Sequence, residues 1–187
     1  SPLAALLIGN RNRALEMEYY SVHNQVPTPT RFHVFLQERM NKTDLPFLSI
    51  SELSNLMASK EVSPVEATEA YLERIEALDG RLHAYVTVTA EEALKAAKAA
   101  EQEILQGNHR GPMHGVPVAV KDQIQTAGIL TTGGSPVFSS NIPTEDATVI
   151  TNLKAAGAVL LGKLNMTEFA TTALSHQFDP PRNPWDL

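Results

Sequence analysis

The chain has 187 residues, of which 43% are hydrophobic and 19% are charged, a composition typical of a globular domain with a buried core. Its 15 basic and 21 acidic side chains give a net charge of −6, which argues against a nucleic-acid-binding or anionic-membrane surface because both need clustered lysine and arginine. Cysteine is absent, which excludes disulfide scaffolds, zinc-thiolate sites and thiol nucleophiles and fits a cytoplasmic location. We therefore expect no nucleic-acid partner, and no membrane association, since the apolar run at residues 3–8 is too short to cross a bilayer.

Residues 1–48 are expected to form an N-terminal extension, separate from a second region at residues 49–187. Residues 4–20 and 32–40 have the composition of helices. Pro27 lies between these stretches, in a segment typical of a linker. The extension is therefore predicted to be helical with an internal linker.

Two helices are predicted at the start of the second region. The apolar residues Leu53, Leu56 and Met57 lie at helical spacing and predict a short amphipathic helix after Ser51. A capping box with proline at the first helical position, Ser63-Pro64-Val65-Glu66, predicts the start of a longer helix.

A strand and a third helix follow. The β-branched run at residues 85–88 predicts the strand. A second capping box, Thr89-Ala90-Glu91-Glu92, opens an alanine-rich helix that should end before Gly107.

The next pattern predicts the fold class. Residues 116–120 form a short apolar strand, residues 147–156 a helix, and residues 159–161 a second apolar strand after Gly157. Strand, helix and strand in this order predict a right-handed βαβ unit and hence an α/β fold with parallel strands. Asn165-Met166-Thr167-Glu168 is then expected to cap a further helix.

The loop after the first of these strands, residues 121–141, is the candidate site, because ligands of open α/β sheets collect beyond the carboxyl ends of the strands. Lys121 begins this loop and has two interpretations: a solvated charge at the end of a strand, or a base that projects into a cleft. Asp122 either orients the loop and accepts hydrogen bonds from backbone amides, or faces solvent.

Other motifs give weaker evidence for a functional site. Residues 157–163 have the spacing of a phosphate-binding P-loop, but Leu164 replaces the required serine or threonine and the spacer is an apolar strand. We reject that motif and expect Lys163 to be an ordinary charge at a strand end. Gly133-Gly134-Ser135 is either an anion-binding nest or, the favoured interpretation, a turn. His114 is expected to be a loop or packing residue.

The segment at residues 111–122, GPMHGVPVAVKD, resembles the lysine-bearing motif of the amidase signature family. Further segments match that family in the same order: residues 131–135, 146–148, 153–159, 162–170 and 183–185. The resemblance extends over about residues 50–187. The resemblance implies that the chain is the N-terminal portion of the amidase-signature fold, an α/β fold whose βαβ units form a mixed, largely parallel sheet flanked by helices.

The family hydrolyses or transfers amides through a Ser–cis-Ser–Lys triad without a metal or cofactor. By resemblance, Lys121 matches the general base, and Ala170 and Thr171 line the acyl pocket. The implied substrate is a small-molecule carboxamide. The family includes amidotransferase subunits that act on misacylated tRNA, and the residues present do not separate that alternative from a hydrolase.

The sequence ends at Leu187, before the Gly/Ser-rich segment that carries both serines in the family. We therefore expect a complementary polypeptide with that segment as a partner, and no amide hydrolysis by the isolated chain. A sheet that ends there would leave an edge and apolar faces that invite association, and a homo-oligomer stays an alternative. Two rival functions remain open: a non-catalytic binding or scaffold chain, and a nucleotide binder at Gly133-Gly134-Ser135.

Overall fold

The computed structural model describes residues 41–171 and 179–186. The two helices and the linker expected within residues 1–40 lie outside the described residues, and the boundary at residue 48 stays a prediction. Within the described part, no helix is both long enough and apolar enough to cross a membrane.

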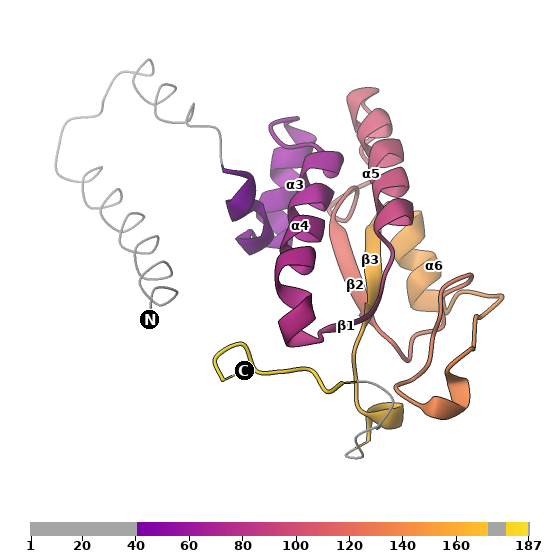
Figure 1. The fold of residues 1–187 in the computed structure, drawn as a ribbon. Helices are drawn as coiled ribbons and strands as arrows, with labels where there is room; N and C mark the ends of the chain where they lie inside the picture. Colours follow the sequence, from indigo (N-terminus) through magenta and orange to yellow (C-terminus); the bar gives the residue numbers. More distant parts are fainter. Residues whose placement is uncertain (1–40, 172–178, 187) are drawn as a thin grey trace, which may run out of the picture. The chain divides into compact units, whose positions relative to one another are not determined.

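A three-stranded mixed sheet forms the centre of the described fold (Figure 1). Its order is β1 (Tyr85–Val88), β3 (Val159–Leu164) and β2 (Pro117–Lys121), with β2 parallel to β3 and β1 antiparallel to it. Helix α6 (Thr148–Ala155) connects the two parallel strands. The predicted βαβ unit and the α/β class with a mixed sheet are therefore confirmed.

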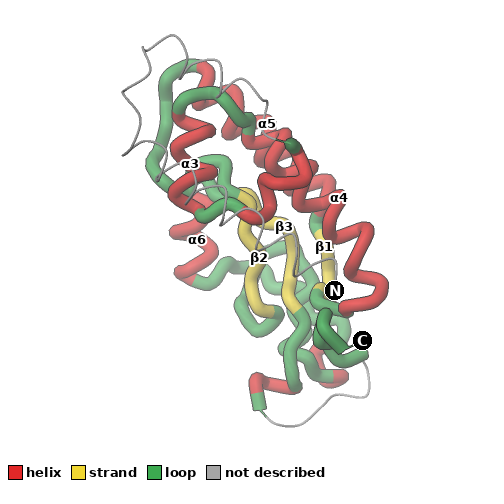
Figure 2. The backbone as a smooth tube through the Cα atoms, turned by 90° about the vertical axis from the view of Figure 1, so that its left-hand side faces the viewer, coloured by secondary structure: helices red, strands yellow, loops and turns green. Residues whose placement is uncertain are grey.

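Helices cover both faces of this sheet. Helices α4 (Pro64–Leu82) and α5 (Ala90–Leu105) lie on one side and α6 on the other, which Figure 1 and the view turned by 90° in Figure 2 both show. Ala93 and Ala97 of α5 are fully buried against Val159 and Leu161 of β3. Small residues on α5 allow this close approach between helix and strand.

A second cluster of buried side chains joins the first helices to the others. It contains residues of a 3₁₀ helix, η1 (Lys42–Phe47), of helix α3 (Ile50–Ala58), and of α4 and α5. Leu45, Leu53 and Met57 are its largest fully buried members. Two of the apolar positions that predicted the first helix, Leu53 and Met57, thus face the core.

Helix α3 begins earlier than predicted. Its N-cap is Ser49, whose hydroxyl accepts a hydrogen bond from the Glu52 amide at 3.2 Å, while the Glu52 carboxylate accepts one from the Ser49 amide at 2.8 Å. These two bonds form a capping box, and hydrogen bonds from Ser49 lower the pKa of the Glu52 carboxyl. The prediction of a start after Ser51 was therefore wrong by two residues.

Removal of this cap is expected to cost stability. Ser49→Ala removes the hydroxyl that accepts a hydrogen bond from the Glu52 amide, and it should lower the free energy of unfolding by about 1 kcal/mol. Ser51 is exposed and makes no side-chain hydrogen bond within the described residues, so Ser51→Ala is the matched control and should change stability by less than about 0.5 kcal/mol. Urea unfolding of both variants measures the difference; equal losses would contradict the assignment of Ser49 as the cap.

The caps of α4 and α5 differ from each other. Ser63 accepts a hydrogen bond from the Glu66 amide at 3.0 Å with Pro64 at the first helical position, as predicted. Thr89 also occupies the N-cap position, but its side chain makes no capping hydrogen bond, because its hydroxyl donates to the Leu160 carbonyl at 3.1 Å. The prediction of a second capping box was therefore wrong, because a carbonyl of β3 accepts the hydrogen bond of the Thr89 hydroxyl. Helix α5 does end before Gly107, as expected.

Among the residues described directly after β3, 165–171, the predicted helix does not form. Residues Glu168–Ala170 form only one 3₁₀ turn, η3, and the Thr167 side chain makes no capping hydrogen bond. The Asn165 amide instead donates to the carbonyls of His83 and Asp179 at 2.8 Å each. The side chain expected to cap a helix thus connects the end of β3 to two distant segments.

Candidate active site

The candidate site lies where the two parallel strands end. Lys121, the last residue of β2, pairs with Leu164, the last residue of β3. The loop at residues 122–147 leaves β2 there, and residues 165–171 leave β3. Because carboxyl ends of parallel strands meet at one edge, both loops begin side by side.

Lys121 is exposed, while its backbone is held at three points. Its strand pairs with β3, its carbonyl accepts a hydrogen bond from Ile124 at 3.0 Å, and the next amide, that of Asp122, donates to the Leu164 carbonyl at 3.0 Å. No residue that the structure describes makes a hydrogen bond or ion pair with the Lys121 amine. A fixed backbone thus presents, at the edge of the sheet, an amine that has no partner in the described part of the chain.

Asp122 faces the protein interior. Its carboxylate is fully buried, and its Oδ2 accepts hydrogen bonds from the Thr132 amide at 2.9 Å and from the Thr132 hydroxyl. Its backbone carbonyl accepts a hydrogen bond from Gly133 at 3.3 Å. The interpretation that Asp122 orients the loop is confirmed, and the interpretation of a solvent-facing carboxylate is wrong.

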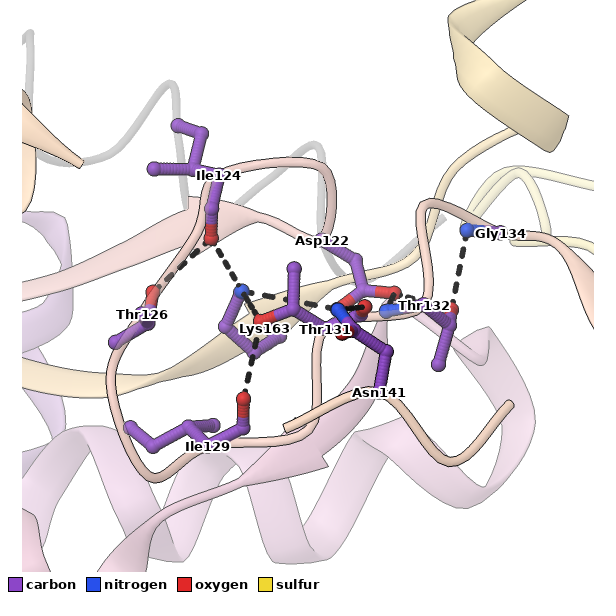
Figure 3. Close-up of polar contacts among 9 residues, drawn as sticks. All are labelled: Asp122, Ile124, Thr126, Ile129, Thr131, Thr132, Gly134, Asn141 and Lys163. Atoms are coloured by element: carbon purple, nitrogen blue, oxygen red, sulfur yellow. Dashed lines mark hydrogen bonds and ion pairs between the residues drawn. The ribbon is translucent and has the colours of Figure 1, made fainter. Parts of the chain in front are cut away.

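Lys163 was expected to be an ordinary charge at a strand end, and this prediction was wrong. The side chain is fully buried, and its Nζ donates to the Ile124 carbonyl and to Thr131 Oγ1, both at 2.6 Å (Figure 3). Nζ also lies 3.8 Å from Asp122 Oδ1. Burial lowers the pKa of the Lys163 ammonium, and the Asp122 carboxylate partly opposes that change.

Gly133 and Gly134 form a turn and leave no anion-binding nest. The Ser135 amide donates to the Thr132 carbonyl at 3.1 Å, and both glycines have positive φ, 61° and 69°. The Gly133 amide donates to the Asp122 carbonyl and the Gly134 amide to Thr132 Oγ1 at 3.1 Å. Because all three amides are used inside the protein, the turn interpretation is confirmed and none remains for a phosphate. The rejected P-loop is equally absent, since its spacer belongs to strand β3.

Residues 165–171 lie directly against this turn. The Ser135 hydroxyl donates to Glu168 Oε1 at 2.6 Å, and the Phe169 amide donates to the Gly133 carbonyl at 2.8 Å. Ala170 and Thr171 follow at the same edge of the sheet and are exposed. Their part in an acyl pocket stays a prediction.

His114 lies outside this site. It is fully buried and precedes the amino end of β2, whereas Lys121 ends that strand. Its Nδ1 accepts a hydrogen bond from the Arg110 amide at 3.1 Å, and its Nε2 lies 3.3 Å from Glu103 Oε2. The prediction of a packing residue is confirmed, and burial lowers the pKa of its imidazole.

The chain is similar to known proteins in sequence. The family described as "Amidase" matches residues 66–187. One subunit of the glutamyl-tRNA(Gln) amidotransferase of Moorella thermoacetica is 49% identical over 146 residues, which cover 77% of this chain and 30% of that protein. The chain thus spans about 30% of the length of this curated relative.

Two solved structures extend the similarity to the fold. The peptide amidase of Stenotrophomonas maltophilia matches with a TM-score of 0.63 and 36% identity, over 67% of this chain and 26% of that chain. An amidase family protein of Bacillus anthracis matches with a TM-score of 0.67 and 29% identity, over 82% of this chain and 33% of that chain. The described fold therefore corresponds to a part of these larger amidase folds.

Proposed function

The chain belongs to the amidase signature family, and from that premise we propose that it supplies the general base of a Ser–cis-Ser–Lys amidase, with Lys121 in that role. The observation that carries the proposal is the exposed Lys121 amine, which no described residue pairs with, on a fixed strand end at the edge of the sheet where ligands of α/β folds bind.

The chemistry requires such an amine. A serine hydroxyl is a weak nucleophile at neutral pH and needs a base beside it. In the proposed reaction, the Lys121 amine accepts a proton through a bridging serine, and the nucleophilic serine oxygen then attacks the carbonyl carbon of the amide. The C–N bond breaks, the leaving amine takes the proton, and water releases the acid from the acyl-enzyme.

The serines of this reaction are proposed to come from the Gly/Ser-rich segment of the family, in the complete enzyme that contains it. Ser135 does not fit the nucleophile's role, because it is fully buried and its hydroxyl donates to Glu168. Ser139 and Ser140 do not match the family's serine positions. Ala170 and Thr171 are proposed to line the acyl pocket, because they are exposed at the same edge as Lys121.

The substrate is proposed to be a carboxamide. A hydrolase would release the amide nitrogen as ammonia or an amine, whereas an amidotransferase subunit would deliver it to an acyl acceptor. The 49% identity to one subunit of a glutamyl-tRNA(Gln) amidotransferase favours the second alternative, a partner in a tRNA-dependent amidotransferase. Release of ammonia that depends on added misacylated tRNA and partner subunits would support the amidotransferase, and release without them would support the hydrolase.

A fluorophosphonate probe tests the site without knowledge of the substrate. An activated serine attacks the phosphorus, fluoride leaves, and a stable phosphonyl-serine forms. We expect the complete enzyme to be labelled on a serine and Lys121→Ala to lose the label. Lys98→Ala changes an exposed lysine of α5 and should keep it. Equal labelling of all three proteins, or of none, would contradict the proposal, and the second result would favour a non-catalytic scaffold.

A further inference from the structure

The loop behind Lys121 is organised around two buried ionisable side chains that the proposed reaction does not use. Lys163 and Asp122 are both fully buried; Lys163 belongs to β3, and Asp122 directly follows the parallel neighbour β2. Figure 3 shows the Lys163 amine inside the loop, with hydrogen bonds to the Ile124 carbonyl and to Thr131. The amine therefore joins two parts of the loop that lie seven residues apart in sequence.

Asp122 makes the complementary connection. It follows Lys121 directly, and its Oδ2 accepts hydrogen bonds from both the amide and the hydroxyl of Thr132. Its Oδ1 makes no hydrogen bond among the described residues and faces Lys163 Nζ at 3.8 Å. Through its carboxylate, Asp122, the residue next to Lys121, is thus connected to Thr132 on the far side of the loop. Lys163 supplies the balancing positive charge.

A buried pair of this kind is a costly way to stabilise a fold. The desolvation of two ions offsets much of their attraction, and apolar residues of similar volume often stabilise as well or better. Removal of one partner is strongly destabilising, because it leaves an uncompensated charge in the interior. The pair is therefore better explained by the precise geometry that it imposes than by its contribution to stability.

We propose that Lys163 and Asp122 are positioning residues for Lys121. This inference rests on the proposed role of Lys121 as the base. The pair fixes the loop that leaves β2, through Ile124, Thr131 and Thr132, and so fixes where the Lys121 amine points. A displacement of about 1 Å at a reacting group can cost about 100-fold in rate, so loss of the pair should lower kcat more than it weakens substrate binding.

The test uses the complete enzyme and three variants: Lys163→Met, Asp122→Asn and the double variant. We expect each single change to lower kcat by about 10- to 100-fold with KM changed much less. Each single variant should also unfold at lower temperature. The double variant has no unbalanced buried charge, so its thermal stability should partly recover while its kcat stays low.

Two further variants complete the experiment. Thr131→Val keeps the shape of the side chain and removes the hydroxyl, which accepts a hydrogen bond from Lys163 and donates one to the Ile129 carbonyl. The variant should fold and lower kcat by roughly threefold to tenfold, because it leaves both buried charges in place and removes only these hydrogen bonds. Lys154 pairs with Asp146 at 2.6 Å in the same βαβ unit, and its side chain is half-exposed. Lys154→Met is therefore the matched control and should leave kcat unchanged.

The outcomes separate a positioning role from a structural one. A low kcat in the double variant despite recovered stability supports the proposal. A kcat that recovers together with stability, or a kcat that is unaffected in every folded variant, overturns it. Failure of the proposed function would be visible elsewhere, as full turnover by Lys121→Ala, and so is distinguishable from failure of this inference.

Discussion

Lys121→Ala in the complete enzyme is expected to lower kcat for amide hydrolysis by about 1,000-fold or more, with KM changed much less. General-base catalysis contributes about 10²- to 10⁴-fold, and groups that act as a unit lose nearly all of their effect together. The exposed amine makes no bond to a described residue, so its removal should leave the fold intact. Steady-state kinetics and a thermal unfolding midpoint measure the two effects separately.

Lys121→Arg distinguishes a base from a positive charge that only binds substrate. A guanidinium stays protonated throughout the neutral range and cannot accept the proton of a serine, so this variant should be as inactive as Lys121→Ala. Lys98→Ala serves as the control for loss of an exposed lysine. An active Lys121→Arg enzyme would exclude Lys121 as the base, while a raised KM with unchanged kcat would assign it to substrate binding instead.

Gly162→Ala is expected to have the largest effect on stability, about 4 kcal/mol or more. Gly162 lies in the central strand β3 with φ 151°, a conformation that L side chains rarely adopt. An added Cβ would overlap the backbone carbonyl oxygen of Thr87 in the neighbouring strand β1. Because a backbone atom cannot move aside without separation of the two strands, the sheet itself would have to shift.

Gly107→Ala is the matched control for this change. Gly107 also has a positive φ, 88°, but no atom lies within 4 Å of the position that a Cβ would take. Its substitution should therefore show only the conformational cost, about 1–2 kcal/mol. Urea unfolding of both variants in the complete enzyme compares them; equal losses would contradict the proposed overlap with Thr87.

The local patterns predicted the elements that depend on nearby residues. The two apolar strands were predicted because each is a short apolar run in its own right, and Ser63 was predicted because a cap involves residues only three apart. Thr89 has the same local pattern but a different structure, because the Leu160 carbonyl, 71 residues later, accepts its hydroxyl. A pattern in sequence does not reveal such a competing partner.

The sequence by itself determined the α/β class, the βαβ unit and the position of Lys121 at the end of a buried strand, because all three follow from short apolar runs and the turns between them. Only the tertiary structure decided the surroundings of that lysine. Lys163 is buried because the Ile124 carbonyl, 39 residues earlier, and the Thr131 hydroxyl, 32 residues earlier, fold over its amine. A lysine's burial depends on whether distant groups satisfy its charge, and that is settled by how the loop after β2 packs over β3 rather than by the residues on either side of the lysine.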